Sequence, residues 1–168
     1  MNLYDATVPI FTKFLTNLDG WLDRAVALAA AKKFDPERFV ECRLALDQYS
    51  LRQQIQAACD QAKYTVAKLS GKDAPSHPDT EQTLPELRAR IQTCIAYLAT
   101  FTPDDFVGAE ERRCAHDWMG GKGMRGGDYL DHLALPNFHF HLVTAYSILR
   151  NNGVELGKTV FIGHLPLS

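Results

Sequence analysis

The sequence lacks the patterns that would direct the chain into a membrane or onto nucleic acid. No apolar run approaches the ~20 residues that span a bilayer, and the richest one, Ala25 to Ala31, ends at Lys32 and Lys33. Basic residues form no run either, and the formal net charge at pH 7 is −2. An acidic balance gives a phosphate backbone no electrostatic partner. We therefore expect neither a membrane nor a nucleic-acid partner.

Signals for export and for disulfide or metal-thiolate chemistry are missing as well. The opening MNLYDATVPIF has no basic segment followed by an apolar one, so no signal peptide is expected. The four cysteines, Cys42, Cys59, Cys94 and Cys114, lie far apart and form no C-x-x-C pair. Reduced thiols and a cytoplasmic location are the simplest expectation. Cys59 and Cys94 fall on apolar helical stripes, which predicts that both are buried as small hydrophobic residues.

Common catalytic motifs do not occur. The stretch from Gly120 to Gly123 contains a lysine, but it lacks the GKS/T ending and the preceding strand of a phosphate-binding loop. No G-x-S-x-G turn of a serine hydrolase is found. The sequence therefore identifies no catalytic residue and no reaction.

What the sequence does contain is apolar residues at helical spacing. A length of 168 residues is typical of a single domain with its own core, here expected over 1–168. Gly71 and Gly153 stand where helices would stop, and Thr83 with Glu86 forms a capping box that predicts a helix start. The fold class is therefore all-α, with a short helical turn over about 37–44. The long helices are expected over about 7–32, 50–70, 83–101 and 128–152.

Residues 103–127 have a different composition. They hold six glycines and show no helical period. The glycine-rich tip at 120–123 suits a β-hairpin or an irregular excursion. We expect a short insert without a core of its own before the last helix.

The stretch PNFHFHLVTAY, residues 136–146, has two incompatible interpretations. On a strand, His139 and His141 would share a face and could share a metal ion. On a helix, two steps of about 100° turn them apart. The apolar positions keep the helical period for longer than they alternate, which favours a helix with a kink or restart at Pro136. His139 and His141 are then not expected to bind one metal ion.

On such a helix His141 faces the interior, and Asn137, four residues earlier, shares its face. Asp60, or the adjacent Gln61, is the expected partner from segment 50–70. One interpretation is a core histidine that is hydrogen-bonded to a buried group. The other is a metal ligand or a proton-transfer group inside the bundle.

Other candidate side chains are weaker. His116 and Asp117 would add ligands only if the insert folded over the bundle, and His77 and His164 are expected to be exposed. Four aromatic residues are expected to pack rather than to stack on a ligand, namely Trp21, Tyr49, Trp118 and Tyr129.

The order of helices and three quoted stretches resemble the DinB/YfiT-like superfamily, most closely an uncharacterised branch known as a domain of unknown function. These stretches are LYDATVPIFTKFLTNLDGWLDRA, ACDQAKYTVAKLSG and ALPNFHFHLVTAYSILRNNGVELGK. The resemblance implies a four-helix bundle in which some members bind a divalent metal through three histidines. The last-helix pair corresponds to His141 and Asn137, and the second-helix ligand falls near Asp60 or Gln61. Two expected histidines are therefore replaced here.

Two functional hypotheses follow. The first is a degenerate site for a divalent metal (zinc or nickel) or for a small molecule at the bundle centre, formed by His141, Asn137, Asp60 and Gln61, with His141 as the metal ligand. The alternative is a non-catalytic helical binding module without a metal, assembled as a homodimer. Trp21 and Phe14, apolar residues beyond the main stripe of the first helix, motivate the dimer contact.

Overall fold

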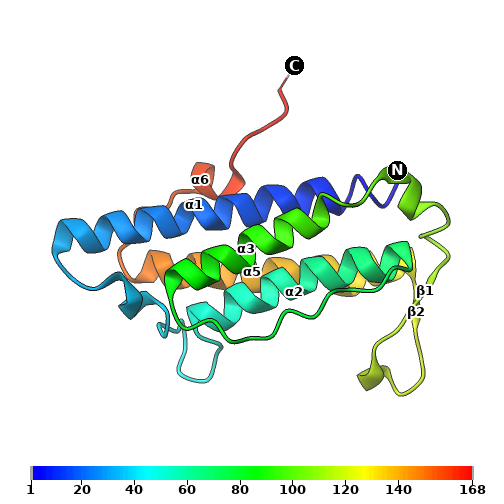
Figure 1. Ribbon diagram of the computed structural model, residues 1–168, viewed down its shortest axis with the longest axis horizontal. Helices are drawn as coiled ribbons and strands as arrows, with labels where there is room; N and C mark the ends of the chain where they lie inside the picture. Colours follow the sequence, from blue (N-terminus) through cyan, green and yellow to red (C-terminus); the bar gives the residue numbers. More distant parts are fainter. Residues whose placement is uncertain (1, 168) are drawn as a thin grey trace.

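The computed structural model describes residues 2–167 and shows a bundle of four long helices (Figure 1). These are α1 (Val8–Lys32), α2 (Leu51–Ser70), α3 (Leu84–Leu98) and α5 (Leu135–Asn151). Helices α2 and α3 start at the same end of the bundle, because residues 72–82 return along α2 between them (Figure 1). We call this segment the strap. Helix α2 packs against both α3 and α5, and α1 closes the bundle on the other side.

The remaining elements are short. Single 3₁₀ turns cover Pro36–Phe39, Pro103–Phe106 and Asp117–Met119. The strands β1 (Arg113–Cys114) and β2 (Met124–Arg125) form one antiparallel pair, in which Cys114 lies opposite Met124. Helix α4 (Gly126–Tyr129) and a π-helical turn (Leu130–Ala134) lead into α5, and α6 (Lys158–Ile162) follows it. The expected all-α bundle with a hairpin insert is confirmed. Within residues 2–167, no helix combines the length and the apolarity that crossing a membrane requires.

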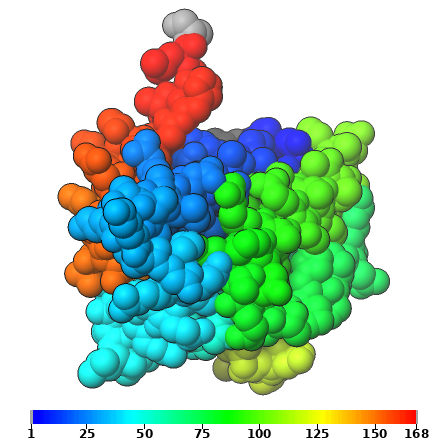
Figure 2. All heavy atoms as spheres, turned by 60° about the vertical axis from the view of Figure 1, so that its left-hand side comes forward, coloured from blue at the N-terminus to red at the C-terminus, as the bar shows by residue number. Residues whose placement is uncertain are grey.

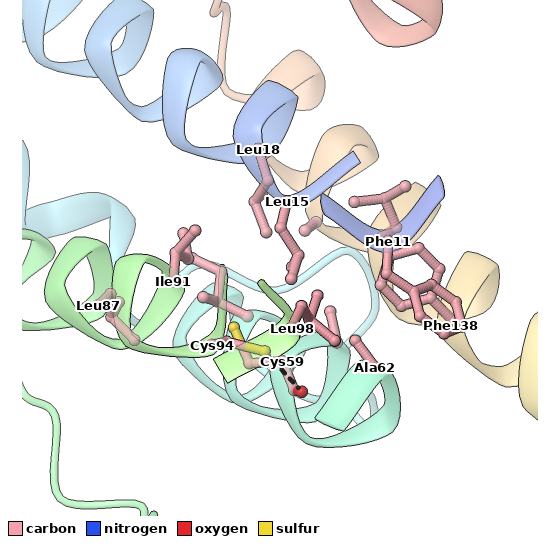
Figure 3. Packing of buried hydrophobic residues seen from close by; sticks show 14 of the residues in the cluster. Phe11, Leu15, Leu18, Cys59, Ala62, Leu87, Ile91, Cys94, Leu98 and Phe138 are labelled. Carbon is pink, nitrogen blue, oxygen red and sulfur yellow. Dashed lines mark hydrogen bonds between the residues drawn. The ribbon is translucent and has the colours of Figure 1, made fainter. Parts of the chain in front are cut away.

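The core is built from the apolar stripes that the sequence contains. Figure 3 shows side chains from all four long helices meeting, among them Leu15, Ile91 and Phe138. Cys59 and Cys94 are buried among them as expected, and the Cys94 thiol donates a hydrogen bond to the Cys59 carbonyl oxygen at 3.3 Å. Burying apolar surface of this kind is the main force that holds such a bundle together.

The predicted helix boundaries have the expected local chemistry. The Thr83 hydroxyl accepts a hydrogen bond from the Glu86 backbone N–H at 3.4 Å, and the Glu86 carboxylate accepts one from the Thr83 N–H at 3.0 Å. This reciprocal pair satisfies backbone donors that the first turn of α3 leaves free. Gly71 ends α2 with a φ of 74°, which a residue without a Cβ adopts at little cost.

The stretch around His139 and His141 is helical, which excludes the strand interpretation. Pro136 is the second residue of α5 and directly follows the π-helical turn. Proline has no N–H and crowds the carbonyl four residues earlier, and a wider turn at that point relieves both problems. The two histidines lie on different sides of α5. The His139 ring lies 5.4 Å from Phe14 of α1, whereas the His141 ring lies parallel to Tyr49, which precedes α2.

The C-terminal helix α6 covers the apolar residues that had motivated a dimer contact. Phe161 stacks on Trp21 with ring centroids 5.5 Å apart, and its ring lies 5.6 Å from Phe14. Trp21 is consequently only 1% exposed. The extra apolar residues of α1 therefore pack within the chain. Beyond α6, residues 164–167 stand away from the body of the molecule (Figure 2).

Three further expectations need correction. Tyr49 and Trp118 were expected to pack, but they are 53% and 70% exposed, because one lies in the loop before α2 and the other at the tip of the hairpin. Trp21 and Tyr129 do pack in the core. His77 was expected to be exposed, yet the strap is held against α3, so this residue is half-buried and its Nδ1 atom is shielded from solvent.

Gly126 provides a stability test of how the insert joins the bundle. A Cβ at this position would collide with the carbonyl oxygen of Ala109, whereas a Cβ at Gly127 would meet nothing within 4 Å. We expect Gly126→Ala to lower the free energy of unfolding by about 2 kcal/mol, as overpacking does. Denaturant unfolding should show Gly127→Ala close to the wild type. Equal stabilities of the two variants would contradict this close packing.

Candidate functional site

A polar cavity of about 470 Å³ opens between α2 and α5. The loop before α2 and the strap complete its walls. The lining consists mostly of amides, carboxylates and tyrosines, with few apolar groups. Its residues are Tyr49, Arg52, Gln53, Gln56, Ala57, Asp60, Gln61, Tyr64, Asp79, Asn137 and His141.

All the residues predicted for the site line this one cavity. His141 and Asn137 come from one face of α5, and Asp60 and Gln61 come from the facing side of α2. The Asn137 Nδ2 atom donates a hydrogen bond to Gln61 Oε1 at 2.7 Å. The structure therefore brings the predicted side chains together, while their function stays a prediction.

The protonation of His141 follows from its neighbours. Gln54 donates its Nε2 hydrogen to the backbone carbonyl of Tyr49 at 3.4 Å, and a carbonyl can only accept. The Gln54 Oε1 atom must therefore face His141 Nδ1, 2.8 Å away, so that Nδ1 carries the proton. The other ring nitrogen, Nε2, keeps its lone pair and has no hydrogen-bond partner among residues 2–167. Burial lowers the pKa of His141 below its ordinary value.

The amide pair beside it is oriented by the same logic. The Thr65 hydroxyl donates to the backbone carbonyl of Gln61 at 2.6 Å, so it can only accept from the Gln61 side chain, at 3.1 Å. Gln61 Oε1 must then face Asn137 and receive its Nδ2 hydrogen. The Asn137 Oδ1 atom consequently remains a free acceptor on the cavity side of α5.

Asp60 belongs to a cluster of charges built around two buried cations. Its Oδ1 atom lies 2.9 Å from Arg90 Nη2 and 2.8 Å from Lys63 Nζ, and the Lys63 contact is an ion pair without hydrogen-bond geometry. Lys63 is fully buried and Arg90 nearly so. Arg90 also binds Asp79 and Glu81 of the strap, both at 3.0 Å. The cluster therefore fastens the strap to α2 and α3.

Glu81 anchors the strap from the other side. Its Oε2 atom accepts a hydrogen bond from Gln56 Nε2 at 2.8 Å. Burial opposes ionisation, but the hydrogen bonds from Gln56 and Arg90 outweigh it and hold the pKa of Glu81 below its usual value. Because a carboxylate only accepts, Gln56 must turn its Oε1 atom away from Glu81.

These side chains do not fit a zinc or nickel ion. Within the described residues 2–167, no three histidine, cysteine, aspartate or glutamate side chains gather as metal ligands would. His141 is a lone imidazole, Asn137 and Gln61 are amides bonded to each other, and Asp60 is already paired with two cations. Sites for these metals normally use at least three nitrogen, sulfur or carboxylate ligands.

The hairpin contributes nothing to the cavity lining. His116 stacks near Trp118, with ring centroids 5.7 Å apart, and its ring lies 5.7 Å from Tyr129. Neither His116 nor Asp117 lines the cavity. The insert projects from one end of the bundle instead of folding over its middle (Figure 1).

Sequence reasoning missed several residues of the site. Gln54, which sets the tautomer of His141, and the exposed Tyr49 beside it carry no distinctive motif. Lys63 and Arg90 could have been identified from the sequence. Each adjoins the apolar stripe of its helix, where burying an unpaired charge would be costly. A basic residue at such a position predicts a buried acidic partner.

Comparison with known proteins places this arrangement in a family. The sequence profile of the family described as a domain of unknown function, DUF1993, matches residues 3–162. No curated protein matches the chain. The chain is similar to a solved structure described as a DinB family member protein from Shewanella denitrificans, with 44% identity and a TM-score of 0.96. This likeness covers 99% of the chain and 94% of the other. The protein therefore belongs to the DUF1993 family and shares the fold of a DinB family member, as the resemblance of its helices had implied.

Proposed function

We propose that this protein binds a small polar molecule in the cavity between α2 and α5, without a bound metal ion. The observation that supports this proposal is His141 Nε2, a lone pair on the cavity wall with no partner in residues 2–167. A core histidine that served packing alone would have its second nitrogen satisfied or sealed from solvent. A cavity of about 470 Å³ is within the usual size of small-molecule sites.

The chemistry available to His141 is that of an acceptor or a base. Its Nδ1 proton is held by Gln54, so the ring presents Nε2 in the form that accepts a hydrogen bond or a proton. Hydrogen bonding at one nitrogen orients the other, as in many catalytic histidines. No nucleophile is assigned to act with it, and the proposal extends to binding and not to a reaction.

The homodimer and the cytoplasmic location stay predictions. Helix α5 exposes two apolar side chains on its outer face, Phe140 at 53% and Val143 at 45%, and these now replace Trp21 and Phe14 as candidates for a contact between subunits. We expect Phe140→Asp with Val143→Asp to abolish any dimer. Sedimentation of the wild type as a monomer at all practical concentrations would remove the dimer proposal.

The proposal that no metal ion is bound is tested by measuring the metal content of the purified protein and its affinity for added metal ions. Element analysis of protein prepared without chelators is expected to show no stoichiometric zinc or nickel. Titration with Zn²⁺ and Ni²⁺ in a calorimeter is expected to show only weak binding that His141→Ala leaves unchanged, because a single imidazole is a poor site. One equivalent of either ion, lost in His141→Ala, would overturn the proposal.

The titration of His141 itself provides a pH test. Its pKa is lowered from 6.5 in the folded state, so the unfolded chain binds the proton more tightly. The folded protein should therefore lose stability as the pH falls below 6.5 toward the lowered pKa. His141→Gln should lose less stability over this range, measured as the unfolding midpoint at several pH values. The contributions of His77 and His116, whose pKa values are also lowered, cancel in this comparison. Parallel pH profiles of wild type and variant would contradict it.

A further inference from the structure

Four side chains in the cavity wall each donate one hydrogen within the protein. Gln61 gives its amide hydrogen to Thr65, and Asn137 gives one to Gln61. Gln56 gives one to Glu81, and His141 gives its Nδ1 hydrogen to Gln54. Each of these directions is fixed by a group at the end of the chain of contacts that can only accept, a backbone carbonyl or a carboxylate.

Each carboxamide keeps its second N–H hydrogen, but the atoms that are left without any partner are acceptors. They are the Nε2 atom of His141, the Oδ1 atom of Asn137 and the Oε1 atom of Gln56, and none has a partner in the described part of the chain. None of the three is sealed from solvent within the fold. Asp60 and Asp79 each use Oδ1 for Arg90, which leaves Oδ2 without a partner in residues 2–167.

The charged side chains around the cavity carry a net negative charge, which disfavours an anion as the acceptor atoms do. Asp60, Asp79 and Glu81 carry three negative charges against two positive ones on Lys63 and Arg90. The sum of these five residues is −1.

One cation does line the cavity, but it is already paired. Arg52 Nη2 lies 2.7 Å from Glu41 Oε1, so its charge is neutralised outside the cluster. The lining donor groups without an acceptor are the Gln53 amide, the hydroxyls of Tyr49 and Tyr64, and the Nε–H of Arg52, which is shielded from solvent. The rings of these two tyrosines border the cavity, and aromatic faces attract cations and not anions. The Tyr64 ring already holds the Lys63 ammonium at 4.4 Å from its centroid.

We infer that the ligand of this cavity is a small organic cation that carries N–H donors, an ammonium or a guanidinium group. This inference rests on the proposed function, because it names the chemical class of the molecule bound at the same site. Donors on such a cation pair with His141 Nε2, Asn137 Oδ1 and the free oxygens of the two aspartates. An anion would meet acceptors and a negative field instead.

The test uses three probes of equal chain length that differ in their head group: n-butylammonium, n-butanol and butyrate. Each is titrated into the ¹⁵N-labelled full chain in phosphate buffer, which contains no competing amine. We expect n-butylammonium to shift the amide signals of the residues around the cavity. Its dissociation constant should be at least about tenfold lower than that of the other two probes, the usual effect of a hydrogen bond to a charged group.

Two variants link the binding to the acceptors. Asn137→Leu removes the Oδ1 acceptor at similar volume, and Asp79→Asn removes one charge at the rim while it keeps the side-chain shape. Each should weaken n-butylammonium binding about tenfold. Asn151→Leu is the matched control, because it removes an exposed amide from the same helix outside the cavity. The unfolding transition of each variant shows whether the fold is retained.

The outcomes separate the two proposals. If n-butanol or butyrate binds as tightly as n-butylammonium, the cavity binds small molecules but the inference about a cation is wrong. If n-butylammonium binds and Asn151→Leu weakens it as much as Asn137→Leu and Asp79→Asn do, the acceptors are not responsible and the inference also fails. If none of the three probes shifts the signals of the cavity, both the inference and the proposed function are overturned.

Discussion

The carboxamide of Gln54 joins the loop before α2 to the imidazole on α5. Because its nitrogen is committed to the carbonyl of Tyr49, its oxygen must receive the Nδ1 hydrogen of His141. The remaining ring nitrogen is thereby left as an acceptor on the cavity wall. A single amide on one helix thus sets the chemical state of a histidine on another, and the character of the cavity depends on it.

The bundle accommodates this polar region because the side chains that bridge α2 and α5 are hydrogen-bonded to one another. Gln61, Thr65 and Asn137 form a chain of hydrogen bonds that ends on a backbone carbonyl of α2. A network of this kind stabilises a core only when its members are satisfied. Below and beside it the bundle is apolar, and the leucines and phenylalanines of Figure 3 hold the helices at a fixed spacing. The cavity therefore lies against a tightly packed apolar core.

The charge cluster around Arg90 fastens the strap to the bundle. Asp60 stands near a position where some relatives are expected to place a metal-binding histidine, yet here it binds Arg90 and Lys63. Burying a carboxylate between two cations is favourable only when all are well paired, and breaking one pair is costly. Since Arg90 also binds Asp79 and Glu81, this cluster holds the strap in place and completes the cavity wall. Asp60 is therefore a structural residue of the cavity as well as part of its lining.

Local sequence patterns were enough to predict the helices, the hairpin insert and the face of the last helix that carries His141 and Asn137. These features depend on local spacing, on the capping box of Thr83 and on the effect of Pro136 on its own turn. The packing of the helices sets which atoms of those side chains remain free, because partners such as Gln54 and Arg90 are distant in the sequence. Packing also places Phe161 over Trp21, and a contact between residues 140 positions apart leaves no local pattern in the sequence. Helical periodicity fixes the direction of a side chain, but the hydrogen-bond partner of that side chain is fixed by packing between helices.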